Sequence, residues 1–136
     1  RMPYLLDSDV LIYYVEGKVA ARRLVVELSP EGIAISAVSY MEAQQGIPRA
    51  QFSQNTQARL DHLLDIAPVI PFGRAEAQRC ADIRELLRSE GKRVRQRALD
   101  LMIAATALEH DLTLVTNNSA DFQDVPGLRL RAERMR

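Results

Sequence analysis

Short apolar segments alternate with longer segments of helical periodicity along nearly the whole chain, and this alternation limits the fold more than any other feature. The apolar segments, which we predict to be strands, occupy residues 4–6, 32–35, 66–70, 112–115 and 128–130. The segments between them, which we predict to be helices, occupy residues 10–15, 18–28, 36–45, 55–64, 74–90 and 98–110, with Asn55 as the N-cap of the fourth. Such alternation is typical of α/β proteins, so we expect a three-layer α/β/α fold with a central parallel sheet of four to five strands.

The length of 136 residues fits one domain, which we expect to span residues 2–136. Arg1 precedes Met2 and is predicted to be a cloning remnant. The single cysteine, Cys80, excludes an intrachain disulfide and a cysteine-based metal site, and its place on an apolar helix face predicts a core residue. No apolar run reaches the roughly 20 residues of a membrane-spanning helix, and acidic residues interrupt the first apolar run. We therefore expect a cytoplasmic protein without a signal peptide.

The charges of the chain cancel in number but not in position. Eighteen basic and eighteen acidic residues give a net charge of zero, which by itself argues against a protein that coats nucleic acid. Residues 98–128, however, contain five acidic residues and no Lys or Arg, whereas residues 84–97 contain six basic and two acidic residues. An acidic centre beside a basic segment is typical of a metal-dependent site for phosphodiesters. Within the basic segment, the candidates for a rim that contacts RNA are Arg93, Arg95 and Arg97.

Four acidic residues come from separate segments that the predicted topology brings to one edge of the sheet. Asp7 follows the first strand, Glu42 lies on the helix after the second, Asp100 begins the buried helix 98–110, and Asp121 follows the fourth strand. Ligands of open parallel sheets bind at this carboxyl edge. Simpler roles stay open for each residue, because Asp7 and Asp100 are also suitable helix caps and Glu42 is a suitable surface residue.

The surroundings of Asp100 favour a metal site. The carboxylate adjoins the apolar segment 101–105, where a charge is costly unless it has a partner. Carboxylates that share a pocket repel one another, and a divalent cation removes that repulsion. Oxygen ligands select Mg²⁺ or Mn²⁺. Ser8, Thr116 and Asn118 are predicted to support these carboxylates as polar neighbours.

Four segments resemble, in order and at ordinary spacing, the motifs of PIN-domain nucleases. They are residues 5–12 around Asp7, residues 39–46 around Glu42, residues 100–107 with Asp100 before a buried Ile-Ala-Ala, and residues 114–122 with Thr116, Asn118 and Asp121-Phe122. The length of the chain and the loop at Gly91 resemble the VapC toxins of type II toxin–antitoxin modules.

This resemblance implies a Mg²⁺- or Mn²⁺-dependent endoribonuclease that acts on tRNA or rRNA. It assigns Asp7, Glu42, Asp100 and Asp121 as the catalytic and metal-binding acids. It also implies a homodimer and an antitoxin whose tail covers the site, often with an arginine among the acids. Asp9 departs from the small polar residue that relatives commonly have; it is a further ligand, a group that repels RNA, or a helix cap, and we favour the cap.

Other interpretations are less well supported. Residues 7–11 also resemble the nucleophile motif of haloacid-dehalogenase-type phosphatases, but that family requires a Lys after Thr116, and Lys18 and Lys92 both precede it. An inactive PIN-like module that only binds RNA is a second alternative, against which the four acids argue. His62 and His110 are not predicted to be catalytic. Tyr13 and Tyr14 face either the core or an apolar groove for an antitoxin helix.

Overall fold

The computed structural model describes residues 3–135 and contains a five-stranded, entirely parallel sheet. The strands are β1 (Tyr4–Leu6), β2 (Ile33–Ser36), β3 (Val69–Ile70), β4 (Thr113–Thr116) and β5 (Leu130–Ala132), in the spatial order β3-β2-β1-β4-β5. The α-helices are α1 (Ser8–Val15), α2 (Val19–Leu28), α3 (Ala37–Gly46), α4 (Ser53–Leu64), α5 (Arg74–Ser89) and α6 (Ala98–Glu109). Four 3-10 turns complete the chain: η1 (Ser29–Glu31), η2 (Ile47–Arg49), η3 (Arg95–Arg97) and η4 (Ser119–Asp121).

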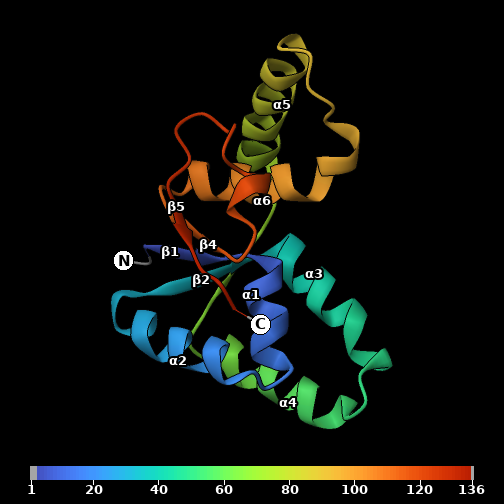
Figure 1. Cartoon of the computed structure of the whole chain (residues 1–136), viewed down its shortest axis with the longest axis vertical. Coiled ribbons are helices and arrows are strands. Elements are labelled where there is room, and N and C mark those ends of the chain that lie inside the picture. Colours follow the sequence, from blue (N-terminus) through green and yellow to red (C-terminus); the bar gives the residue numbers. More distant parts are fainter. Residues whose placement is uncertain (1–2, 136) are drawn as a thin grey trace.

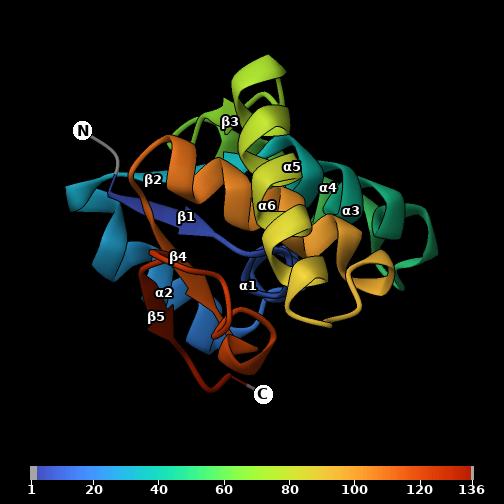
Figure 2. The ribbon, with the colours of Figure 1, turned by 90° about the horizontal axis from the view of Figure 1, so that it is seen from above.

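Helices cover both faces of the sheet, as the alternation predicted. Figure 1 shows α5 and α6 on one side of the strands and α1, α2 and α4 on the other, and Figure 2 shows α5 and α6 lying across the sheet. Neighbouring residues of a strand point to opposite faces, so Leu6 packs with the core under α1, α2 and α4, whereas Leu5 packs with the core under α5 and α6. The expected three-layer α/β/α fold is confirmed.

Among the described residues, helix α6 contains the longest run of buried residues of any helix, and its sequence explains why. Leu101 and residues 103–107 are buried, which matches the absence of charge from this stretch. The hydroxyl group of Thr106, fully buried, donates to the carbonyl oxygen of Met102 in the preceding turn at 2.9 Å. The helix therefore forms a rigid support that holds Asp100 at its first turn.

Several boundaries differ from the sequence predictions, among them those of α4, β3 and β5. Helix α4 begins two residues before Asn55, so Asn55 lies inside the first turn and is not the N-cap. Strand β3 is shorter than predicted, because Pro68 has no N–H group to donate and contributes only its carbonyl oxygen, which accepts from Ile35. Strand β5 begins two residues late, since the chain is still turning at Gly127, where φ is +77°.

The predictions for Arg1 and for both ends of the expected domain lie outside residues 3–135. Within those residues, no helix is long and apolar enough to cross a membrane.

Candidate active site

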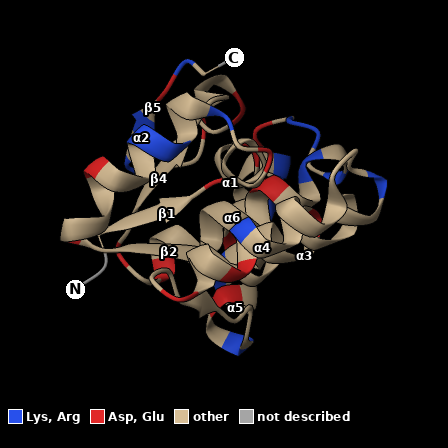
Figure 3. Ribbon diagram, turned by 90° about the horizontal axis from the view of Figure 1, so that it is seen from below, with Lys and Arg blue, Asp and Glu red and all other residues tan. Residues whose placement is uncertain are grey.

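The candidate site lies where the strand order changes direction. The chain runs from β1 outward to β2 and β3, and then returns to place β4 and β5 on the other side of β1. Such a switch point is where open parallel sheets bind ligands, at the carboxyl ends of the strands. Asp7 directly follows β1, and its backbone N–H donates to the carbonyl oxygen of Val115 in β4 at 2.9 Å. Figure 3 shows acidic segments beside the start of α1, next to this edge.

Asp7 is the most buried acid of the site, with 4% of its surface exposed. One carboxylate oxygen accepts the N–H of Ser8 at 2.8 Å and caps α1, and the other accepts the hydroxyl group of Thr116 at 2.7 Å. Burial, followed by the negative charge of Asp9, raises the pKa of Asp7 to about 7, although both hydrogen bonds act to lower it. Capping of α1 thus uses only one of the two carboxylate oxygens of Asp7. Because its pKa is raised, Asp7 is protonated more readily than an ordinary aspartate is.

Glu42 is joined to Ser8 through a cluster of hydroxyl groups. The Ser8 hydroxyl lies 2.5 Å from Oε1 of Glu42 and 2.9 Å from the hydroxyl oxygen of Ser39, which in turn lies 3.2 Å from that of Ser36. Ser36 and Ser39 are almost completely buried, and the sequence interpretation missed both as site residues. A signal was present: Ser36 precedes α3 as its N-cap, and spacings of three residues place Ser39 and Glu42 on one face of that helix.

Asp9 fastens the turn after β4 to the start of α1. One carboxylate oxygen accepts the N–H of Val10 at 2.7 Å, and the other accepts the N–H of Asn117 at 3.1 Å and the side-chain amide of Asn118 at 2.8 Å. The predicted role as the helix cap is wrong, because Asp7 occupies the N-cap position. Burial raises the pKa of Asp9, and these hydrogen bonds oppose the rise.

Asp100 and Asp121 complete the acidic edge, and their carboxylates accept no such hydrogen bond from residues 3–135. Asp100 lies in the first turn of α6, where no side chain caps the helix, so the alternative of a helix cap is excluded. Burial raises the pKa of Asp100, and the negative charges of Asp121 and Glu42 raise it further. Asp121 is the exposed last residue of η4. The four predicted acids therefore influence one another electrostatically, although they come from distant parts of the chain.

These carboxylates suit a hard divalent cation by their chemistry rather than by a closed geometry. Among residues 3–135, no three His, Cys, Asp or Glu side chains lie close enough together to form a ready-made metal-binding group. Burial raises the pKa of Asp7 and Asp100, and the negative charges of neighbouring carboxylates raise it further; a cation placed between the carboxylates removes that repulsion. Oxygen donors of this kind fit Mg²⁺ or Mn²⁺.

The three predicted rim arginines separate into two groups. Arg93 and Arg95 are exposed. Arg97 forms two hydrogen bonds with the carboxylate of Asp124, at 2.9 and 2.6 Å, and its side chain is only 23% exposed. Arg97 is thus paired with a partner within the chain, and its role as an RNA contact stays a prediction.

The histidines and the cysteine lie elsewhere. His110 contacts Glu76 at 2.7 Å beside the end of α6, His62 lies on α4, and Cys80 lies on the buried face of α5. The Glu76 carboxylate also accepts the N–H of Gly73, and its hydrogen bonds, including the one with His110, hold its pKa below the usual value.

Comparison with known proteins identifies the family. The model of the PIN domain matches residues 4–128. The chain is 30% identical over 128 residues to the tRNA(fMet)-specific endonuclease VapC of Shigella flexneri, covering 94% of this chain and 96% of that protein. It is 36% identical over 138 residues to ribonuclease VapC10 of Mycobacterium tuberculosis, covering 94% and 98%. The structure of VapBC2 from Rickettsia felis, bound to a DNA fragment from its promoter, matches with a TM-score of 0.82 at 27% identity, covering 95% of this chain and 97% of that one. The chain therefore belongs to the PIN-domain family and, within it, to the VapC ribonucleases.

Proposed function

We propose that this chain is the Mg²⁺- or Mn²⁺-dependent endoribonuclease of a type II toxin–antitoxin module, and that it hydrolyses phosphodiester bonds of tRNA or rRNA in the cytoplasm. The observation that carries the proposal is the group of mutually repelling carboxylates at the switch point of the sheet, among which Asp7 and Asp100 have raised pKa values. Membership of the PIN-domain family removes the phosphatase alternative.

The four acids have different parts in this proposal. Asp7 is the fixed member, since Ser8 and Thr116 hold both of its oxygen atoms in place. Glu42 is oriented by the hydroxyl group of Ser8, and Asp100 and Asp121 come from the first turn of α6 and from η4. Together they hold a divalent ion, which lowers the pKa of the attacking water and offsets the charge of the phosphate. Arg93 and Arg95 are exposed and contact the RNA backbone outside the acids.

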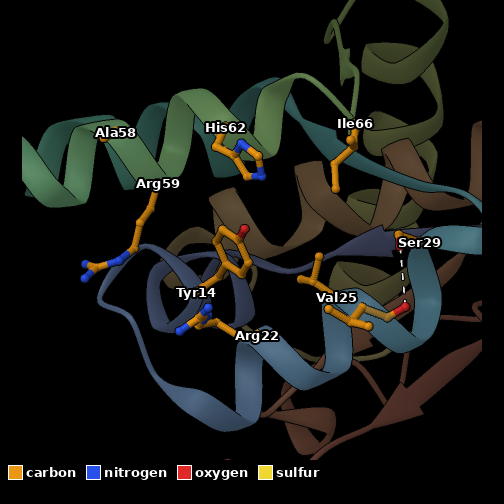
Figure 4. A pocket seen from close by; sticks show the side chains of 9 residues that line it. Tyr14, Arg22, Val25, Ser29, Ala58, Arg59, His62 and Ile66 are labelled. Atoms are coloured by element: carbon orange, nitrogen blue, oxygen red, sulfur yellow. Dashed lines mark hydrogen bonds between the residues drawn. The ribbon is translucent and has the colours of Figure 1, made fainter.

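An antitoxin is the proposed protein partner, and a groove between α1, α2 and α4 suits it. Figure 4 shows Tyr14 and Val25 facing His62 and Ile66 across a hollow of about 500 Å³ between α1, α2 and α4. The neighbouring Val26 is 72% exposed, and Arg22 and Arg59 also line the hollow. Apolar walls with arginines favour an amphipathic helix that carries acidic side chains. The prediction of a groove at Tyr13 and Tyr14 thus has support at Tyr14, which lines the hollow, and both side chains also pack against the core. The homodimer stays a prediction, which the mass of the protein in solution checks.

Cleavage of RNA by matched variants tests the activity. We expect the wild-type protein to cut RNA with Mg²⁺ or Mn²⁺ and to be inactive in EDTA, and Asp100→Asn and Glu42→Gln to abolish cleavage while the protein stays folded. Asp111→Asn is the matched control, because Asp111 is an exposed aspartate paired with Arg129 beyond the other end of β4, in a left-handed conformation that Asn also adopts.

The outcomes separate the two remaining functions. Full activity in EDTA contradicts a metal site, and unchanged cleavage by Asp100→Asn contradicts the assignment of this acid. RNA binding without cleavage, at any concentration of either ion, favours the inactive PIN-like module instead. Sequencing the RNA ends produced in cells after induction distinguishes tRNA from rRNA targets.

A further inference from the structure

Arg97 joins the two segments that carry the outer acids of the site. It is the residue before α6, so it lies one helical turn before Asp100. Its guanidinium reaches the segment after β4, where it donates to the carbonyl oxygen of Asp121 at 3.0 Å and to both carboxylate oxygens of Asp124 at 2.9 and 2.6 Å. Lys92 adds a contact with Asp124 at 3.2 Å.

We propose that Arg97 is a positioning residue, which, paired with Asp124, holds the Asp121 turn against the start of α6 and so fixes how Asp121 faces Asp100. The proposal rests on the function proposed above, in which Asp100 and Asp121 hold a divalent ion. Arg97 touches neither carboxylate of that pair by a hydrogen bond and acts through the backbone of Asp121.

The need for such a clamp follows from charge. Asp100 and Asp121 are both carboxylates of the acidic edge, and carboxylates that share a site repel each other when both are ionised. Asp121 belongs to η4, a short exposed turn, and its side chain has no hydrogen bond from residues 3–135 to resist that repulsion. A two-point guanidinium–carboxylate pair has a defined geometry, which a single lysine contact lacks.

The ion pair between Arg97 and Asp124 persists over the range of pH in which an enzyme is assayed. Hydrogen bonds from Arg97 and Lys92 lower the pKa of Asp124 to about 2, so its carboxylate remains ionised above that pH. The side chains of Arg97 and Asp124 are only 23% and 25% exposed, which limits competition from water and salt.

A titration with Mn²⁺ tests the clamp against the simpler effect of charge. We expect Arg97→Gln and Asp124→Asn each to weaken Mn²⁺ binding on the order of tenfold, measured by isothermal titration calorimetry. We expect the double variant to be no weaker than either single variant, because both remove one interaction. If Arg97 acts only as a positive charge near the site, Arg97→Gln instead tightens Mn²⁺ binding, and the double variant, with both charges gone, returns to the wild-type affinity.

A matched pair on α5 gives the control. Arg88 and Glu85 also form a two-point pair, at 2.9 and 2.6 Å, through Nε and Nη2 of the arginine on an exposed surface of the helix. We expect Arg88→Gln to leave Mn²⁺ affinity and cleavage at wild-type values. Circular dichroism confirms that every variant is folded, and Arg97→Lys, which keeps the charge but not the fork, should bind Mn²⁺ nearly as weakly as Arg97→Gln.

The result also separates this proposal from the function on which it rests. Wild-type Mn²⁺ affinity in Arg97→Gln and Asp124→Asn, with loss of binding in Asp100→Asn, overturns the clamp and leaves the metal site standing. Unchanged Mn²⁺ binding in Asp100→Asn contradicts the proposed function itself. A higher KM for RNA in Arg97→Gln at unchanged Mn²⁺ affinity overturns the clamp in favour of a contact between Arg97 and RNA.

Discussion

The two halves of the acidic site are held in place by different means. In the inner half, hydroxyl groups from the buried ends of strands and helices bond to the carboxylates of Asp7 and Glu42. In the outer half, the carboxylates of Asp100 and Asp121 receive no hydrogen bond from residues 3–135. Arg97 holds the turn that carries Asp121 through the carbonyl oxygen of Asp121 and the carboxylate of Asp124. The inner carboxylates are therefore held directly by hydrogen bonds, whereas the outer ones are held only through the segments that carry them.

The two halves therefore differ in what fixes the position of their carboxylates. Burial fixes Asp7 at a cost in charge, and the cost is visible as the raised pKa of Asp7. Asp100 is half-buried and Asp121 is exposed, and without hydrogen bonds to their carboxylates the position of these outer acids depends on contacts made elsewhere. We therefore expect changes in the inner half to affect folding stability and the pH profile, and changes in the outer half to affect mainly metal affinity.

The largest expected effect is that of Asp7→Asn on the metal-free protein. The pKa of Asp7 is raised from 3.8 to about 7, so between these values the folded state binds more protons than the unfolded state does. Stability in EDTA should therefore fall as pH rises from about 4 to about 7 and stay level above, by a few kcal/mol, since one pKa unit is about 1.4 kcal/mol. Asp7→Asn should flatten this fall and abolish cleavage, as urea unfolding at several pH values and an RNA assay will measure.

The raised pKa values of Asp9 and Asp100 act in the same direction, so only the difference between wild type and Asp7→Asn reports on Asp7. Equal slopes for the two proteins would mean that burial does not raise the pKa of this residue.

The fold was predictable from the sequence because the patterns that indicate strands and helices extend over only a few neighbouring residues. Segments of a few apolar residues and the uncharged stretch of α6 showed the strands and the buried helix directly. The errors occurred where a single residue outweighs the pattern: Pro68 shortens β3, and the turn at Gly127 delays β5.

The site was predictable only where its residues follow strands or share a helix face. Asp7 and Asp121 were found by their places after β1 and β4. The pairing of Arg97 with Asp124 was missed because the two residues lie 27 positions apart, and no periodicity links them. Ser39 was missed because a serine inside an apolar segment is not distinctive until its hydroxyl group is seen beside that of Ser8.

A smaller effect is expected for Thr116→Val, which keeps the shape of the side chain. The fully buried hydroxyl group donates to Asp7 and accepts the N–H of Asn118 at 3.0 Å, and its loss should cost about 1–3 kcal/mol of stability. That hydrogen bond lowers the pKa of Asp7, so the variant should show a pH–rate profile whose acidic limb lies at higher pH. Thr106→Val is the matched control, since Thr106 is equally buried and donates only within α6. An unshifted limb in Thr116→Val would mean that this bond does not control the ionisation of Asp7.

The smallest effect is expected for Asp9→Asn, and it distinguishes a structural acid from a ligand. The carboxylate of Asp9 already accepts three hydrogen bonds from Val10, Asn117 and Asn118, and an amide oxygen retains part of this set. If Asp9 serves the turn, cleavage should fall only a few-fold, well short of the roughly hundredfold loss that a ligand's outer partners already produce. The pKa of Asp7 should fall at the same time, because the neighbouring negative charge that raises it is gone. Complete loss of cleavage, with the protein folded, would instead make Asp9 a fifth acid of the metal site. The inner half would then contribute three metal-binding acids, Asp7, Asp9 and Glu42.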